Sequence, residues 1–367
     1  MQSRNKIFGR TLAIFLVFFF SISLIQANAQ MAAKPVIVGY VGGYKGLVDM
    51  NMIHPSKLTY INYAFVNVIA NRAVLTNLKT DTINLKNLAV LKKKDPSLKV
   101  LISIGGWSWS KNFSDAVLSD TSRKAFAQSA IAIVRKFNLD GIDIDWEYPG
   151  SLGAKDNIYR SEDKQNYTLL FRSLREALDT LQNETGRKML LTAAVGGFPS
   201  FLHTTDMGKA QQYLDYVNLM TYDLDGGALT QHHTSLLDAD RTIKAFAAAG
   251  VPYNKMLMGI AFYGHSYIVK KDSNRGLGDS IVTHGRGYGY SYIKDSLIGY
   301  HYYRDRHAKA AYWYNPTNNE FITADDTWSV KLKCQYVLYH KMAGVMFWEY
   351  VSDPKEYLLD EIDNIIK

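Results

Sequence analysis

Short apolar runs recur along the chain and alternate with stretches of helical periodicity. Runs that are apolar on successive positions are typical of strands buried on both faces. Eight such runs predict strands at residues 35–41, 60–69, 99–104, 139–146, 189–195, 216–221, 256–262 and 344–348. Apolar residues spaced three and four apart predict helices at 115–137, 162–181, 238–249, 329–342 and 354–366.

This alternation predicts one parallel α/β unit, and eight repeats favour a (β/α)8 TIM barrel. An open doubly wound sheet is the alternative, and it would need a glycine-rich phosphate loop after its first strand. Glycines occur there at Gly39, Gly42, Gly43 and Gly46, but without the GxGxxG spacing. We therefore expect a barrel over residues 30–367.

One interval breaks the rhythm, because about 80 residues separate the seventh predicted strand from the eighth. It contains several glycines and short stretches of alternating sequence pattern, typical of strands, such as 311–314. We interpret residues 264–328 as a small α+β insertion subdomain. Insertions after a barrel strand lie on the face where active sites form, so this one should make a wall of the cleft.

The N-terminus has the pattern of a secretory signal peptide. Arg4, Lys6 and Arg10 precede a mostly apolar stretch at 11–25, and Ala27-Asn28-Ala29 fits a small-residue cleavage site. We predict a signal peptide at 1–29, a secreted protein, and no stable membrane association after cleavage. A retained membrane anchor is the alternative, although the apolar stretch is short for a span.

The formal net charge is +8, and loss of the three basic residues of the signal peptide leaves +5. The remaining basic residues are scattered, without the clusters interleaved with aromatics that bind nucleic acid, so we expect no nucleic-acid partner. Aromatic residues make up 13% of the chain. Such rings suit sugar faces as well as cores, so composition alone does not separate the two.

An acidic ladder stands on the fourth predicted strand, at Asp143, Asp145 and Glu147. Alternate residues of a strand share a face, so these carboxyls point the same way while the isoleucines between them face the helices. A solvated acidic strand and a calcium site are the alternatives. The isoleucines argue against the first, and the lack of Gly and Asn between the acids argues against the second.

Crowded carboxyls raise one another's pKa, and a carboxylic acid that is protonated near neutral pH can protonate a glycosidic oxygen. We assign that role to Glu147, which has the longest side chain and the outermost position. Asp145 would share its proton and stabilise positive charge. Asp143, deeper in the barrel, would hold Asp145 in place.

Five segments together resemble glycoside hydrolase family 18, the chitinase family. Residues 140–147 (DGIDIDWE) resemble its DxxDxDxE signature, and 103–107 (SIGGW) resemble its SxGG motif. Residues 220–223 (MTYD), 259–264 (GIAFYG) and 344–348 (GVMFW) are similar to its sixth, seventh and eighth strands. The interruption after the seventh strand also resembles the insertion of one subfamily.

The resemblance implies a retaining hydrolysis of β-1,4-linked N-acetylglucosamine polymers in which the substrate's own N-acetyl oxygen attacks, giving an oxazolinium intermediate. Glu147 would be acid and base, and Asp145 would orient the N-acetyl group. Tyr222 would hydrogen-bond that group's carbonyl oxygen. Asp143 and Ser103 would support Asp145. No metal or cofactor is expected.

The resemblance also implies a set of substrate contacts. Trp348 would form the floor of the cleft and Asp223 would contact the same sugar. The remaining expected contacts are Trp107, Ser103, Met220, Tyr40, Phe65, Tyr148 and Tyr263. Tyr40 and Phe65 have an alternative role as core aromatics.

One position departs from the family pattern, because His265 stands where many members with the insertion carry arginine. We expect this histidine to be mostly neutral at pH 7. Two other functions stay open: an endo-β-N-acetylglucosaminidase acting on N-glycan cores, and a non-catalytic chitin-binding lectin.

Overall fold

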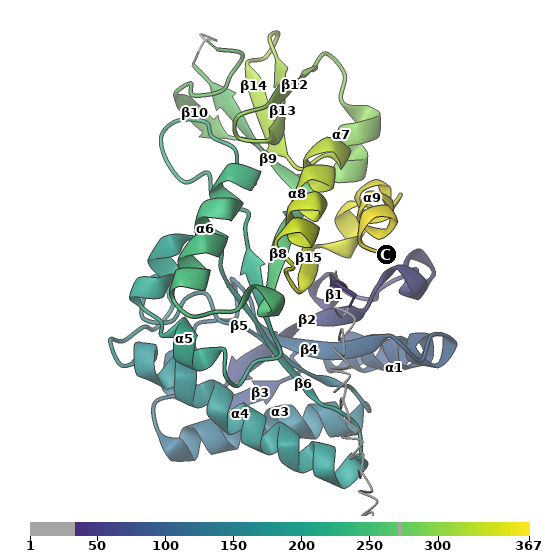
Figure 1. Ribbon diagram of the computed structural model, residues 1–367, viewed down its shortest axis with the longest axis vertical. Coiled ribbons are helices and arrows are strands. Elements are labelled where there is room, and N and C mark those ends of the chain that lie inside the picture. Colours follow the sequence, from purple (N-terminus) through teal and green to yellow (C-terminus); the bar gives the residue numbers. More distant parts are fainter. Residues whose placement is uncertain (1–33, 271–273) are drawn as a thin grey trace, which may run out of the picture. The chain divides into compact units, whose positions relative to one another are not determined.

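The computed structural model describes residues 34–270 and 274–367, so the predicted signal peptide lies outside the described residues. Eight parallel strands form a closed barrel (Figure 1). They are β1 (Val36–Gly42), β2 (Tyr60–Ile69), β4 (Lys99–Gly105), β5 (Gly141–Asp145), β6 (Leu190–Gly196), β7 (Tyr216–Met220), β8 (Met256–Ala261) and β15 (Gly344–Trp348). The barrel closes because β1 pairs with both β2 and β15. The predicted barrel and its eight strands are confirmed.

The longer helices of the barrel are α1 (Leu78–Lys94), α3 (Asp120–Lys136), α4 (Asp163–Thr185), α6 (Leu236–Ala248), α8 (Thr327–Tyr339) and α9 (Tyr357–Ile366). The helix predicted at 115–137 is divided into the short α2 (Phe113–Ala116) and α3. Ser119 causes this break, because it caps α3 in a capping box with Ser122. Sequence reasoning missed α1, whose apolar residues Leu85, Leu88 and Leu91 lie among many lysines.

Apolar side chains fill two layers. The outer layer lies between strands and helices, and it includes Ile142, Ile144 and Trp146 of the acidic segment. The inner layer lies within the barrel and includes Val38, Ala194, Leu257 and Met346. Because the isoleucines of β5 face the outer layer, the carboxyls between them face the inner side of the sheet, as the alternation predicts.

A second, antiparallel sheet follows β8 directly (Figure 1). It contains β9 (Tyr263–Val269), β10 (Ile281–His284), β12 (His301–Asp305), β13 (Ala310–Asn315) and β14 (Glu320–Ala324), with β11 (Tyr288–Gly289) beside β9 and the helix α7 (Tyr290–Ser296). This is the α+β insertion expected between the seventh and eighth barrel strands.

Buried contacts join the insertion to the barrel. The Lys333 ammonium of α8 lies 2.7 Å from the Asp325 carboxylate, and both side chains are fully buried. The same carboxylate accepts a hydrogen bond from the Ala261 backbone at the end of β8. In the part of the chain that the structure describes, no helix has the length and apolar content needed to cross a bilayer.

Candidate active site

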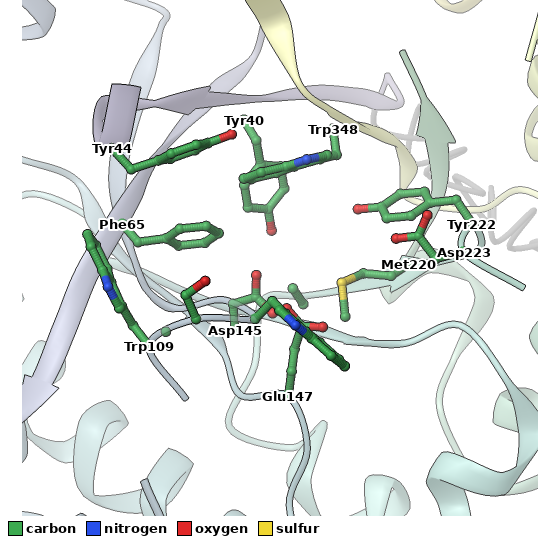
Figure 2. Close-up of a pocket in the computed structure, with 14 residues that line it drawn as sticks. Tyr40, Tyr44, Phe65, Trp109, Asp145, Glu147, Met220, Tyr222, Asp223 and Trp348 are labelled. Carbon is green, nitrogen blue, oxygen red and sulfur yellow. The ribbon is translucent and has the colours of Figure 1, made fainter. Parts of the chain in front are cut away.

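A cavity of about 470 Å³ opens at the C-terminal ends of the barrel strands (Figure 2). Its lining residues come from many parts of the chain: Tyr40, Tyr44, Phe65, Gly105, Trp107, Ser108, Trp109, Asp145, Glu147, Ala194, Met220, Tyr222, Asp223 and Trp348. Active sites of (β/α)8 barrels form at this end, because the loops after the strands converge there.

The carboxyls of β5 and the residues after it reach different depths. Asp143 is fully buried, Asp145 is 4% exposed, and Glu147 stands two residues beyond the end of the strand. Trp146 turns to the outer layer, where its ring stacks on Phe113 at 5.2 Å between centroids. The predicted alternation holds, although the strand ends earlier than residue 146.

Asp143 is held by four hydrogen bonds. Its Oδ2 accepts from the Ser103 hydroxyl at 2.7 Å and the Tyr40 hydroxyl at 3.0 Å. Its Oδ1 accepts from the Thr192 hydroxyl at 2.6 Å and the Asn218 amide at 3.1 Å. Burial raises the pKa of Asp143, while these donors oppose the rise by stabilising the carboxylate.

Asp145 has a contrasting environment. Its Oδ1 is buried, and it has no hydrogen-bond partner among the described residues. Burial raises the pKa of Asp145 well above its ordinary value, and the nearby Glu147 and Asp143 carboxyls raise it further. These surroundings disfavour the charged form of Asp145.

Glu147 lines the cavity from a backbone fixed by polar side chains. Its amide donates to the Ser110 hydroxyl at 2.9 Å, and its carbonyl accepts from the Asn157 side chain at 2.7 Å. Burial raises the pKa of Glu147 from 4.5 to about 7; the Tyr148 side chain lowers it and Asp223 raises it. A carboxyl with this pKa can give and take a proton near neutral pH.

Two glycines at the end of β4 allow the chain to approach the carboxyl strand closely. Gly105 and Gly106 have φ values of +114° and +77°. A Cβ on Gly105 would lie 2.0 Å from the Asp145 carbonyl oxygen, and one on Gly106 would lie 2.6 Å from the Phe65 ring. Only glycine fits at both positions, which explains this segment of the sequence.

Aromatic rings form one side of the cavity (Figure 2). The Trp348 ring lies nearly parallel to Phe65, at 5.3 Å and 18°, and to Tyr44, at 6.2 Å and 5°. Tyr40 tilts against Trp348 at 5.7 Å. Trp107 is 54% exposed, which is unusual for a tryptophan without a binding role. These surfaces suit the apolar faces of sugar rings.

Tyr222 and Asp223 lie across the cavity from Phe65, and the Tyr222 hydroxyl points inward (Figure 2). Tyr222 is 7% exposed. Asp223 has a positive φ of 57° and accepts a hydrogen bond from the Tyr263 hydroxyl at 2.5 Å. Partial loss of solvent would raise the pKa of Asp223, but hydrogen bonds and charges from His233 and His265 hold it below its ordinary value.

His265 corrects one expectation. Its Nε2 lies 3.2 Å from Asp223 Oδ1, and its Nδ1 lies 3.0 Å from Asp225 Oδ2. Burial alone would lower its pKa, but these two carboxylates raise the pKa of His265 to about 10. The prediction of a neutral ring was wrong, because the sequence does not show that two carboxylates flank it. His265 therefore keeps the positive charge that an arginine would carry.

Most predicted site residues meet at the cavity. Nine of them line it: Tyr40, Phe65, Trp107, Asp145, Glu147, Met220, Tyr222, Asp223 and Trp348. Four do not. Ser103 and Asp143 are buried beneath it, Tyr148 packs on Trp107 and Phe198, and Tyr263 supports Asp223. Ser103 was predicted as a substrate contact, and it instead donates its hydrogen bond to Asp143.

Sequence reasoning missed residues that lie outside the five segments. Tyr44 lines the cavity from the turn after β1. Thr192 and Asn218 hold Asp143 from β6 and β7. A polar residue on the inner face of an otherwise apolar strand was the available signal, because burying it without a partner is costly.

Comparison with known families decides the family. The model described as "Glycosyl hydrolases family 18" matches residues 36–353. This chain belongs to glycoside hydrolase family 18. The match includes both the barrel strands and the insertion, so the family covers the cavity as a whole.

Among family 18 relatives, Chitinase A1 of Niallia circulans is 32% identical over 93% of this chain. The chain spans 60% of that relative's length. A solved family 18 N-acetylglucosaminidase from Paenibacillus barengoltzii is 37% identical, with a TM-score of 0.83, 90% of this chain covered and 99% of that one.

The same fold also occurs in a chitinase-like agglutinin from Robinia pseudoacacia. It is 27% identical with a TM-score of 0.79, and the match covers 90% of this chain and 99% of the agglutinin. Fold alone therefore does not distinguish a hydrolase from a sugar-binding protein, and the argument for this family 18 chain depends on its site.

Proposed function

We propose that this protein hydrolyses β-1,4-linked N-acetylglucosamine polymers, with retention of configuration, by substrate-assisted catalysis. The observation that carries the proposal is the pair of carboxyls, buried Asp145 and half-buried Glu147, that line one aromatic-walled cavity. The raised pKa of Glu147, about 7, suits a group that gives a proton in one step and takes one in the next.

In the first step, protonated Glu147 gives its proton to the glycosidic oxygen as the bond from C1 to that oxygen breaks. The N-acetyl carbonyl oxygen of the same sugar forms a new bond to C1, giving an oxazolinium ion. Tyr222 donates a hydrogen bond to that group and holds it in position. In the second step, Glu147 takes a proton from water and the water oxygen bonds to C1. The bond from C1 to the N-acetyl oxygen breaks, which opens the oxazolinium ring and restores the N-acetyl group.

Asp145 receives the N–H of the N-acetyl group. Its buried Oδ1 lacks a donor among the described residues, and an unsatisfied buried oxygen is stabilised by any ligand that supplies one. Ionised Asp145 also opposes the positive charge of the oxazolinium ion. Asp143, held by four donors beneath the cavity, raises the pKa of Asp145 through its charge.

Trp348, with Phe65 and Tyr44 beside it, would support the apolar face of the sugar that reacts. Asp223 would accept from a hydroxyl of that sugar, and the charged His265 would keep Asp223 ionised. Chitinase A1 is a chitinase by name, which supports chitin or its oligosaccharides as the substrate class.

The test is a time course on N-acetylglucosamine hexamers, on deacetylated hexamers and on a glycoprotein that carries N-glycans. Cleavage of the acetylated oligomer alone is expected. Release of the N-glycan without cleavage of the hexamer would favour an N-glycan endoglycosidase. Binding of the hexamer without cleavage, equal in the protein and in its Glu147→Gln variant, would favour a lectin.

We also propose that residues 1–29 are a cleaved export signal and that the protein is secreted. The charged start, apolar stretch and Ala27-Asn28-Ala29 site support this. Sequencing the N-terminus of protein recovered outside the producing cells should give Gln30 as the first residue. Protein that stays in the membrane with an intact N-terminus would contradict the proposal.

A further inference from the structure

Three side chains from separate segments meet at the edge of the cavity. Asp223 follows β7, His233 lies on the loop before α6, and His265 stands on β9. One possible ligand atom from each lies within 4.8 Å of the other two. Asp223 Oδ1 is 3.2 Å from His265 Nε2 and 3.5 Å from His233 Nδ1.

These spacings fit a small divalent transition ion. Zinc binds imidazole and carboxylate at about 2.0–2.2 Å in tetrahedral geometry, which places its ligand atoms roughly 3.3–3.6 Å apart. The three possible ligand atoms, Asp223 Oδ1, His233 Nδ1 and His265 Nε2, form a triangle. The two distances from Asp223 Oδ1 are already near that length. The distance between the two imidazole nitrogens has only to shorten to the same value.

His233 supplies an independent sign of a missing ligand. The side chain is fully buried, and neither ring nitrogen makes a hydrogen bond with any residue that the structure describes. Its backbone amide donates to the Thr323 hydroxyl of β14, which fixes the segment against the insertion. The Asp223 Oδ1 atom lies 3.5 Å from His233 Nδ1, too far for a good hydrogen bond, so this buried imidazole is poorly satisfied and an ion at Nδ1 would remove part of that cost.

His265 has the second partner that metal-binding histidines usually have. Its Nδ1 faces Asp225 Oδ2 at 3.0 Å, and the Tyr267 hydroxyl donates to the same oxygen. Asp225 is itself 7% exposed. A carboxylate on one imidazole nitrogen orients the ring and directs the other nitrogen at the metal, and here that nitrogen points to Asp223.

We propose that Asp223, His233 and His265 form a binding site for Zn²⁺ or a similar transition-metal ion, and that occupancy inhibits the enzyme. Borderline-soft ions suit a set of two imidazoles and one carboxylate. The fourth position would face a second hollow of about 400 Å³, which Asp223 and His265 also line. Inhibition rests on the proposed function, since the metal would occupy the carboxylate assigned to the substrate.

Two contacts set the strength of this site. The metal has to replace the hydrogen bond from Tyr263 to Asp223 Oδ1 and the contact of His265 Nε2 with the same oxygen. Metal binding to histidine releases protons, so the affinity for the ion should rise with pH. The metal is not needed for the proposed hydrolysis, in which Glu147 and Asp145 carry the chemistry.

The experiment is calorimetric titration of the purified protein with Zn²⁺, accompanied by visible absorption with Co²⁺, whose bands are intense in tetrahedral sites. The ligand variants are His265→Arg and His233→Asn, and Asp225→Asn removes the supporting carboxylate. His284→Ala is the control, because His284 lines the same hollow without belonging to the triangle. Thermal unfolding of each variant identifies any that fails to fold.

We expect one ion per chain. His265→Arg and His233→Asn should each weaken binding by about 100-fold or more, Asp225→Asn by about 10- to 100-fold, and His284→Ala should leave it unchanged. Absence of binding, or unchanged affinity in folded His265→Arg, would overturn the site. Calorimetry needs no activity, so failure of the proposed hydrolysis would not be confused with failure of the site. Metal binding at the triangle with undiminished hydrolysis would overturn the inhibitory role.

Discussion

Asp143 and Asp145 are separated by one residue on β5, yet the structure gives their carboxyls opposite surroundings. Asp143 accepts four hydrogen bonds, whereas the Oδ1 of Asp145 has no partner among the described residues. The first carboxyl is therefore stabilised as an anion and the second is left to be satisfied by a ligand. This difference supports the proposed roles, in which Asp143 is a positioning residue and Asp145 contacts the substrate.

The support of Asp143 can be tested at Thr192. Thr192→Val keeps the shape of the side chain and removes the hydroxyl that donates to Asp143 Oδ1. With one donor lost, the carboxylate is less stabilised, so we expect kcat to fall about tenfold while KM changes little. The control is Thr205→Val, which removes a buried hydroxyl that donates to the Phe201 carbonyl instead. Equal losses in both variants would point to a general packing effect.

The pH profile should report Glu147. Its protonated form gives the proton, and burial raises its pKa to about 7, so kcat/KM should fall as pH rises through about 7. The Tyr148 side chain lowers that pKa, so Tyr148→Phe should move the alkaline limb to higher pH. Tyr159→Phe, at an exposed tyrosine of the following loop, is the control. A limb that moves to lower pH in Tyr148→Phe would contradict the assignment.

Glu147 should also make stability depend on pH. Its folded pKa, about 7, lies above the ordinary value of 4.5, so its contribution is full below 4.5 and is lost as pH rises through about 7. Glu147→Gln cannot ionise, so above pH 7 it should be more stable than the parent protein by about 1–3 kcal/mol.

Denaturant unfolding of both proteins, in mildly acid and in mildly alkaline buffer, measures this difference. Glu176→Gln is a matched control on the surface of α4, where the side chain is largely exposed. A stability gain of Glu147→Gln that is the same in both buffers would show that ionisation of Glu147 is not its cause.

Tyr44 should contribute to sugar binding through its ring. It is 44% exposed, lies nearly parallel to Trp348, and donates from its hydroxyl to Glu349. Tyr44→Ala should raise KM for N-acetylglucosamine oligomers about tenfold through lost stacking. Tyr44→Phe should stay within about twofold, because Lys45 still pairs with Glu349. Equal effects of both changes would assign the role to the hydroxyl instead.

The barrel could be predicted because each strand is a short apolar run and because these runs alternate with helices. The acidic ladder could be predicted too, since residues two apart on a strand share a face. Helix α1 was missed because lysines interrupt its apolar positions.

The parts of the site that could not be predicted from the sequence depend on contacts between distant segments. Thr192 and Asn218 are ordinary polar residues in sequence, and only the closed barrel brings them to Asp143. In the same way, His265 is charged because Asp223 and Asp225 converge on it from the loop after β7. The spacing of residues along the chain does not reveal such long-range contacts.

In the proposed mechanism, the substrate's N-acetyl group attacks C1 while Glu147 acts as acid and base. The most direct test is NMR of the first products released from N-acetylglucosamine hexamers, in parallel for the parent protein and Glu147→Gln. We expect β-anomers at the earliest times from the parent protein and no turnover by the variant. Products that appear first as α-anomers, or turnover by Glu147→Gln near the parent rate, would contradict this mechanism.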